Sequence, residues 1–316
     1  MLSHCFYKAG FGKISVLFLF LLILIPFPAR AQDAVSILRA ENRGGSAAAT
    51  APLMANAQGF NFVRNLIFFP ARVDGRQGNF ILDTGAPSLL LNHRGETEKT
   101  SPATTGLGAG GEVELASQRV RSFEMGGLEM GSRWALSLDL RSMESRTGQR
   151  IDGYVGYDLI SKGELRIDYP NRNFRLLNSE RKPLEKGEAP IAVLRFSYID
   201  HLPVVELKMG GKNLRFVVDT GAGKNLIDPQ YAILGDQTNR EINIQGLDGG
   251  QATLGVCQMP VPERLPVTAE QLQFVTMDLS HLQSPGHPPI AGIIGADFLA
   301  KYCVGIDYRR RKLYLW

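Results

Sequence analysis

The chain has 316 residues, about twice the length of a usual domain, so two domains or one internally repeated unit is expected. Hydrophobic residues make up 44% of it and charged residues 21%, which excludes a polytopic membrane protein, a disordered polyelectrolyte and a fibrous protein. Three of the 35 basic residues and no acidic residue lie in the first 31 positions. The rest has 32 basic and 31 acidic residues, so no strong field favours nucleic acid or an anionic membrane as a partner.

Residues 1–31 have the composition of a signal peptide. Lys8 and Lys13 precede an almost unbroken apolar run over residues 14–25. After it, Ala29-Arg30-Ala31 has small residues at the two positions that a signal peptidase recognises. The apolar run of 12 residues is shorter than the ~20 needed to cross a bilayer. An uncleaved anchor is the alternative. We expect cleavage, a periplasmic or secreted protein, and no stable membrane span afterwards.

Cleavage would remove Cys5 and leave two cysteines, Cys257 and Cys303. This count excludes a disulfide-dense fold. In an oxidising compartment the two thiols could pair, and two buried free thiols are the alternative.

Residues 32–58 are rich in Ala, Gly, Ser and Asn and predict a flexible tether. Beyond it, apolar or alternating runs predict strands and glycine-rich segments predict the turns between them. The elements expected in the first half are a hairpin of 64–73 and 79–82, a second hairpin with its tip at 106–111 and its returning strand at 112–115, a short helical turn at 158–162, and a closing hairpin of 165–169 and 174–176.

The second half repeats this order. Its expected elements are a hairpin of 204–209 and 215–218, a second tip at 246–250 with a returning strand at 252–254, a helical turn at 297–301, and a closing hairpin of 304–308 and 313–315.

Two segments show that the halves are copies of one unit. Asn-Phe-Ile-Leu-Asp-Thr-Gly-Ala at 79–86 returns as Arg-Phe-Val-Val-Asp-Thr-Gly-Ala at 215–222, an offset of 136 positions. Ile-Asp-Gly-Tyr-Val-Gly at 151–156 returns as Ile-Ala-Gly-Ile-Ile-Gly at 290–295, an offset of 139. The repeat predicts two homologous all-β lobes, residues 59–185 and 186–316, related by pseudo-two-fold symmetry.

The repeated Asp-Thr-Gly motif suggests an active site. A single copy after a strand is most often a turn. In a two-fold arrangement, however, equivalent loops can meet at the axis, and Asp83 and Asp219 are the only acidic residues common to both loops. Two carboxylates at about 3 Å share one proton, so that one can draw a proton from water while the other donates to a carbonyl oxygen.

These motifs make the chain resemble the pepsin/retropepsin-type aspartic proteases, over roughly residues 60–316. The resemblance implies the acid protease fold, with β-barrel-like lobes, a cleft between them, and glycine-rich hairpin tips that act as flaps over an extended peptide. It implies Asp83 and Asp219 as the catalytic dyad. The supporting residues that it implies are threonines that brace the two loops and glycines of the tight turns, namely Thr84, Thr220, Gly85 and Gly221.

The chain departs from the pepsin pattern at three places. Ala86 and Ala222 stand where pepsin-like enzymes carry Ser or Thr, and the loss of a hydrogen bond to the charged carboxylate predicts activity in weakly acidic to near-neutral solution. No Tyr lies between residues 95 and 122 to match the flap tyrosine. Pro87 and Gly223 differ between the halves, so the cleft is expected to be asymmetric.

Other chemistries have weak support. Gly106-Leu-Gly-Ala-Gly-Gly111 fits G-x-G-x-x-G, but a strand follows it where a dinucleotide site needs a helix. His93, His201, His281 and His287 are scattered and are interpreted as surface-loop residues, so neither a metal nor another cofactor is expected. The duplicated Asp139 and Asp278 are interpreted as turn residues.

The sequence therefore predicts an exported aspartic endopeptidase that cleaves peptide or protein substrates with activated water. Its single chain would suffice as a monomer to form the active site. A non-catalytic peptide-binding or scaffold protein with the same fold is the first alternative, and a protease that processes only itself or one partner is the second.

Overall fold

The computed structural model describes residues 53–54, 56–94, 104–108, 111–245, 251–263, 265, 271–283 and 286–316. The expected signal peptide, most of the expected tether, and the hairpin tips at 109–110 and 246–250 lie outside the described residues. No helix in the described part of the chain has the length and apolar character that crossing a membrane requires.

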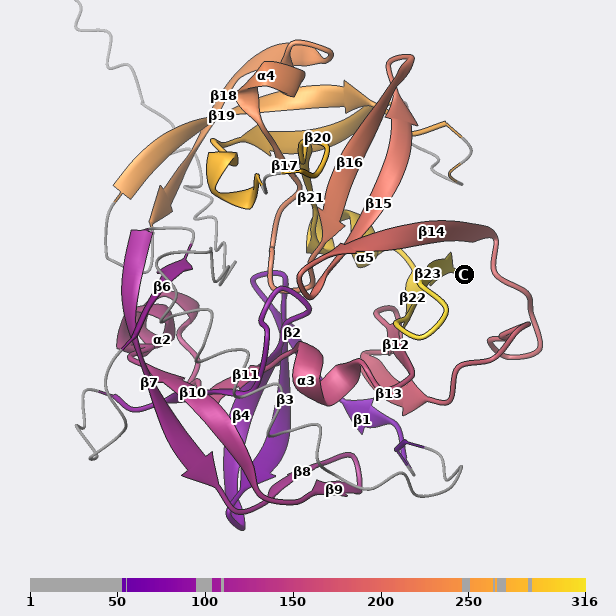
Figure 1. Ribbon diagram of the computed structural model, residues 1–316. Coiled ribbons are helices and arrows are strands. Elements are labelled where there is room, and N and C mark those ends of the chain that lie inside the picture. The colour runs from indigo at the N-terminus through magenta and orange to yellow at the C-terminus, as the bar shows by residue number, and fades with distance from the viewer. Residues whose placement is uncertain are drawn as a thin grey trace, which may run out of the picture.

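The first half forms one sheet, which lies at the bottom of Figure 1. Its strand order is β6-β7-β10-β5-β11-β4-β3-β8-β9, and β2 pairs with β3. The strands are β2 (Asn61–Val63), β3 (Leu66–Val73), β4 (Arg76–Leu82), β5 (Leu90–Asn92), β6 (Thr104–Gly108), β7 (Gly111–Val120), β8 (Phe123–Met125), β9 (Leu128–Met130), β10 (Arg133–Leu138) and β11 (Gly153–Val155).

The second half repeats this arrangement at the top of Figure 1, with the order β15-β16-β21-β17-β20-β19-β18. The strands are β15 (Leu202–Met209), β16 (Lys212–Val218), β17 (Leu226–Ile227), β18 (Asp236–Gln245), β19 (Gln251–Pro260), β20 (Gln271–Thr276) and β21 (Gly292–Ile294).

A third group of strands joins the two lobes and lies beside them in Figure 1. It continues the second sheet in the order β15-β14-β23-β22-β12-β13-β1, so strands of both halves share it. The strands are β1 (Gln58–Gly59), β12 (Glu164–Asp168), β13 (Asn173–Leu177), β14 (Ala192–Ile199), β22 (Cys303–Asp307) and β23 (Lys312–Leu315).

The mostly β architecture with two equivalent lobes confirms the predicted all-β acid protease fold. The first and closing hairpins of each half form where the sequence predicts them. The second hairpins form as β6–β7 and β18–β19. Residues 106–108 and 111, which were expected in the first tip, are paired strand residues instead. The turns at Asp74-Gly75 and Gly210-Gly211 adopt the positive φ that tight hairpins need.

The helices are short. The predicted helical turns appear as α3 (Tyr157–Ile160) and α5 (Ala296–Leu299). Three helical elements of the described residues were not predicted, namely α2 (Arg141–Thr147), α4 (Pro229–Ala232) and the 3₁₀ turn η1 (Ser280–Leu282). The helix α2 ends at Gly148, which has the left-handed conformation that glycine adopts without strain.

One hydrophobic cluster runs continuously through both lobes and the shared strands, and each lobe also has a separate cluster of its own. Phe80 packs edge-on against Phe123 with ring centroids 5.7 Å apart, and Phe69 packs in the same way on Phe174, at 4.9 Å. Burying an aromatic side chain of this size stabilises a fold by about 1.5–3 kcal/mol. The core therefore fixes the two lobes to the strands that join them.

Strand pairing brings the two Asp-Thr-Gly loops to equivalent places. In the first lobe β11 lies parallel to β4, with Val155 opposite Leu82. In the second lobe β21 lies parallel to β16, with Ile294 opposite Val218. The loop that follows β4 therefore begins at the same point of its sheet as the loop that follows β16.

Candidate functional site

Asp83 and Asp219 are the first residues after β4 and β16, and both are fully buried. The N–H of Asp83 donates to the Val155 carbonyl at 3.1 Å, and that of Asp219 donates to the Ile294 carbonyl at 3.0 Å. These bonds continue the ladders of the parallel strands by one residue. The backbone position of each aspartate is thus set by the core of its own lobe.

Backbone N–H groups of each loop hold its own carboxylate. Asp83 Oδ1 accepts from the N–H of Gly85 at 2.7 Å and from that of Ala86 at 3.1 Å. Asp219 Oδ1 accepts from the N–H of Gly221 at 2.8 Å. The Oδ2 atoms of both aspartates are buried and accept no hydrogen bond from the described N–H groups.

Each carboxylate lies against the glycine of the opposite loop. A Cβ at Gly85 would stand 2.8 Å from both carboxylate oxygens of Asp219, and a Cβ at Gly221 would stand 2.5 Å from the carboxyl carbon of Asp83. Contacts this short are excluded for a side chain. Because both positions are glycine, the two loops approach closely enough for the carboxyl groups to act on each other.

Thr84 and Thr220 join the loops with four buried hydrogen bonds. The N–H of Thr84 donates to Thr220 Oγ1 at 3.1 Å, and the N–H of Thr220 donates to Thr84 Oγ1 at 3.0 Å. Thr84 Oγ1 donates to the Val218 carbonyl at 3.2 Å, and Thr220 Oγ1 donates to the Leu82 carbonyl at 2.9 Å. Each hydroxyl therefore reaches into the opposite lobe and both donates and accepts there.

The repeated Ile-x-Gly-x-x-Gly segments support the loops from below. A Cβ at Gly156 would stand 2.5 Å from the Ala86 carbonyl oxygen, and one at Gly295 would stand 2.4 Å from the Ala222 carbonyl oxygen. The residues that follow these glycines donate to the same two carbonyls, from Tyr157 at 2.9 Å and from Ala296 at 2.8 Å. These glycines are therefore required for close packing between backbone segments.

Burial and mutual repulsion perturb the two carboxyl groups. Burial raises the pKa of Asp219 to about 6, although hydrogen bonds from the Gly221 N–H and from the Asp83 side chain lower it. Burial, and next the negative charge of Asp219, raise the pKa of Asp83 well above its usual range, although the Gly85 N–H lowers it. Two carboxyl groups that interact this strongly titrate as a pair, so the pair holds one proton over a range that begins near pH 6.

A histidine and an asparagine make further contacts between the lobes, and the sequence did not predict them. His201 Nε2 lies 2.7 Å from the carbonyl oxygen of Gly85. Asn65 Nδ2 donates to the Gly223 carbonyl and to Asp297 Oδ1, both at 2.8 Å. His201 is only 4% exposed, so its interpretation as a surface-loop residue was wrong. The available signal was that each of the two residues stands 18 positions before an Asp-Thr-Gly aspartate.

Asp139 and Asp278 lie outside this site and serve as turn residues, as predicted. Asp139 accepts from the N–H and the guanidinium of Arg141, and Asp278 accepts from the N–H of Ser280 at 2.8 Å.

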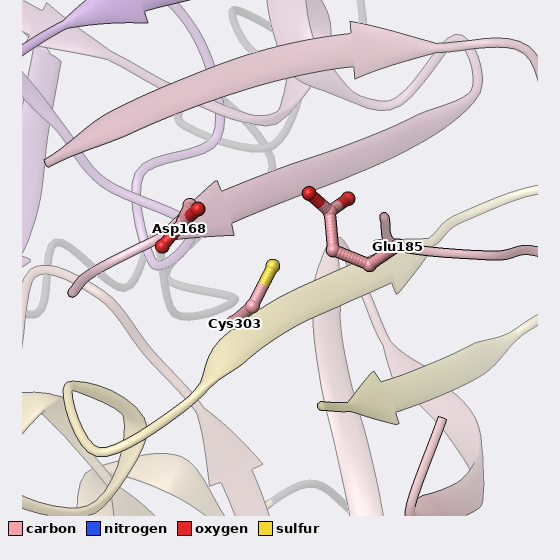
Figure 2. A group of neighbouring side chains, drawn as sticks. All are labelled: Asp168, Glu185 and Cys303. Atoms are coloured by element: carbon pink, nitrogen blue, oxygen red, sulfur yellow. The ribbon is translucent and has the colours of Figure 1, made fainter. Parts of the chain in front are cut away.

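Figure 2 shows three buried side chains that lie close together beside the shared strands, Asp168 in β12, Cys303 in β22 and Glu185 in the segment between β13 and β14. Their potential ligand atoms lie within 4.8 Å of one another. Arginine side chains already bond to Glu185, from Arg166 at 3.0 Å and from Arg175 at 2.8 Å.

Asp168 already has hydrogen-bond partners, and the Cys303 thiol is poorly suited to bind a metal. Asp168 accepts from the N–H and the side-chain amide of Asn171 and lies 3.5 Å from Lys186. Burial raises the pKa of the Cys303 thiol to about 12, so it stays protonated. The cluster is therefore an ion-pair network that anchors the shared strands. Cys303 and the buried Cys257 are both free thiols.

Two family models match the chain, one in each half. Residues 69–159 match the model described as aspartyl protease, and residues 200–307 match the model described as retroviral aspartyl protease. Each matched segment contains one Asp-Thr-Gly loop and one Ile-x-Gly-x-x-Gly segment. Among the curated proteins, none matches the sequence.

Proposed function

Because the chain belongs to the retropepsin-like aspartic protease family, we propose that it is an endopeptidase that cleaves peptide bonds with a water molecule activated by Asp83 and Asp219. The observation that carries the proposal is the convergence of the two buried carboxyl groups, each against the glycine of the opposite loop. The perturbed pKa values of the pair support it, because a shared proton supplies an acid and a base at one place.

In this mechanism the ionised member of the pair takes a proton from water, and the oxygen of that water attacks the carbonyl carbon of the scissile bond. The protonated member donates to the carbonyl oxygen, which gives a tetrahedral gem-diol. The dyad then returns a proton to the amide nitrogen and accepts one from the diol. The C–N bond breaks, and the products are a carboxylic acid and an amine. The reaction forms no covalent bond between enzyme and substrate.

The substrate of this proposal is a peptide or protein segment in extended conformation. The support is that β6 and β18 stand at the ends of the strand orders of the two lobes, where backbone groups are free to pair with an added strand. A bound peptide that contains a statine, a mimic of the tetrahedral intermediate, should slow amide hydrogen exchange in both strands. Protection confined to one lobe would contradict binding across the cleft.

The export proposed from residues 1–31 would bring the enzyme into contact with periplasmic or extracellular proteins. A single chain supplies both aspartates, which supports activity as a monomer.

The decisive experiment compares Asp83→Asn and Asp219→Asn with the wild-type protein on a mixed peptide library at several pH values. Each variant should lose cleavage by a factor of at least about 10³, since neither can share the proton, while circular dichroism stays unchanged. Asp139→Asn is the matched control, because Asp139 is an aspartate of the same repeat that caps a turn outside the site. Equal cleavage by the wild type and the two dyad variants would refute the proposal.

A further inference from the structure

His201 connects the second lobe to the Asp83 loop of the first. It lies in the turn between β14 and β15, next to Asp200, which has a positive φ of 52°. Its ring is buried and packs edge-on against Tyr157, with centroids 6.1 Å apart. The 2.7 Å contact from Nε2 to the Gly85 carbonyl oxygen crosses from one lobe to the other.

The chemistry of this contact fixes the position of one proton. A carbonyl oxygen only accepts hydrogen bonds, so Nε2 must carry a hydrogen, whether the ring is neutral or charged. The contact is therefore a donated hydrogen bond from His201 to Gly85.

The same peptide group also contacts the aspartate. The Gly85 carbonyl belongs to the peptide whose N–H, on Ala86, donates to Asp83 Oδ1 at 3.1 Å. A peptide that accepts at its oxygen becomes a better donor at its nitrogen, and hydrogen bonds in such a chain strengthen each other. A continuous path thus runs from the His201 ring through one peptide to the Asp83 carboxylate.

The second lobe has no equivalent of this path among the described residues. Asn65 occupies the position that corresponds to His201, and its amide bonds to the Gly223 carbonyl and to Asp297. Neither of these groups belongs to the Gly221–Ala222 peptide, which is the counterpart of the Gly85–Ala86 peptide. The hydrogen-bonded path from His201 therefore supports Asp83 and not Asp219, and the environments of the two aspartates differ.

We propose that His201 is a positioning residue for Asp83, which it holds by aligning and polarising the Gly85–Ala86 peptide from the opposite lobe. This inference rests on the proposed function only for its kinetic consequence. The effect on the carboxyl group is independent of whether the protein cleaves peptides.

The test uses three substitutions in the full chain. His201→Gln keeps an N–H donor at similar reach, His201→Phe keeps a ring without the donor, and His201→Leu is a second variant without the donor in case the first folds poorly. The dyad titration is followed by NMR of ¹³C-labelled Asp carboxyl groups, and kcat and KM are measured on the best library peptide.

Phe and Leu should raise the upper apparent pKa of the dyad, which follows Asp83, by about half a unit, because the ionised Asp83 carboxylate loses part of a charge-assisted hydrogen bond. They should lower kcat about tenfold with KM nearly unchanged. Gln should restore both quantities to near wild-type values, which a role limited to filling space would not do.

Asn65→Leu is the matched control, because it removes the symmetry-related contact between the lobes without touching the Asp83 loop. It should lower stability and leave the dyad titration where it is. An equal shift in Asn65→Leu, or no shift in the His201 variants, would overturn the inference. A wild-type protein that cleaves nothing but whose dyad titration still responds to His201 would refute only the proposed function.

Discussion

Arg166 and Gly305 occupy equivalent positions in the two halves and are also partners of each other in the shared strands. They are separated by the 139 positions of the repeat, and they lie opposite each other where β12 pairs antiparallel with β22. A residue that pairs with its own counterpart lies on the symmetry axis. The pseudo-two-fold axis therefore passes between Arg166 and Gly305 as well as between Asp83 and Asp219.

The two residues at this position differ because the axis has room for one long side chain. A Cβ at Gly305 would stand 2.5 Å from Glu164 Oε1 and 3.0 Å from the Trp316 ring. The space is taken by Glu164 and by the Arg166 guanidinium, which bonds to it at 2.7 Å and lies 4.5 Å from the centroid of the Trp316 ring. On the axis, the lobes are thus joined by the buried Arg166–Glu164 ion pair, and Gly305 leaves the space that this pair occupies.

Arg166→Leu should destabilise the protein strongly at neutral pH. The guanidinium is 6% exposed and holds both Glu164 and Glu185, so its loss leaves buried carboxylates with reduced compensation. Breaking such a pair from one side costs about 3–5 kcal/mol in the free energy of unfolding, measured by urea denaturation. The double variant Arg166→Leu/Glu164→Leu should recover part of the loss. A double variant less stable than the single one would contradict this account.

Thr84→Val should remove hydrogen bonds that join the two Asp-Thr-Gly loops. The hydroxyl accepts from the Thr220 N–H and donates to the Val218 carbonyl, and valine can do neither. Because a buried N–H is left without its partner, we expect a loss of about 2–3 kcal/mol in the free energy of unfolding. Thr84→Ser keeps the hydroxyl and should cost less than about 1 kcal/mol. If Ser were as harmful as Val, the methyl group rather than the hydrogen bonds would be responsible.

The lobes could be predicted from the sequence because their signals are local. Alternating strands and the turns at Asp74-Gly75 and Gly210-Gly211 predict hairpins, and the repeat of Asp-Thr-Gly predicts that two loops correspond. The pairing of β12 with β22 could not be predicted, because nothing in a closing hairpin indicates which distant strand it meets. The contact of His201 was missed because its partner Gly85 is 116 positions away, although the shared spacing of 18 residues before each aspartate marks His201 as the counterpart of Asn65.

Activity should follow a bell-shaped pH profile with its acidic limb near pH 6. The active form of the dyad holds one proton. At low pH both aspartates are protonated, and the active form appears when Asp219 loses its proton as pH rises through its raised pKa of about 6. The alkaline limb follows at higher pH, because burial and the charge of Asp219 hold the pKa of Asp83 further up. The measurement is kcat/KM from pH 2 to 9 at constant ionic strength. A rate still climbing below pH 3 would contradict the expected profile.

Asp219→Asn should stabilise the fold at neutral pH while it abolishes activity. The folded pKa of Asp219 is about 6 and the usual value is 3.8, so the folded state holds the proton more tightly than the unfolded state. The stability that this provides is complete below about pH 3.8 and is lost as pH rises through about 6, which amounts to about 3 kcal/mol by pH 7. Asparagine does not ionise, so the variant should match the wild type at pH 4 and exceed it at pH 7.

Asp139→Asn is a control in which the change in stability at neutral pH should have the opposite sign. Its hydrogen bond from Arg141 lowers the pKa of Asp139, so its small contribution is present at neutral pH and is lost as pH falls through the folded value. Free energies of unfolding from urea denaturation at pH 2, 3, 4, 5, 6 and 7 separate the two cases. If Asp219→Asn has the same pH dependence as the wild type, burial does not raise the pKa of this carboxyl group and the electrostatic account of the dyad is wrong. If the stabilities of Asp219→Asn and the wild type diverge between pH 4 and 7, the ionised carboxyl group of Asp219 destabilises the folded wild-type protein, because burial disfavours its charge.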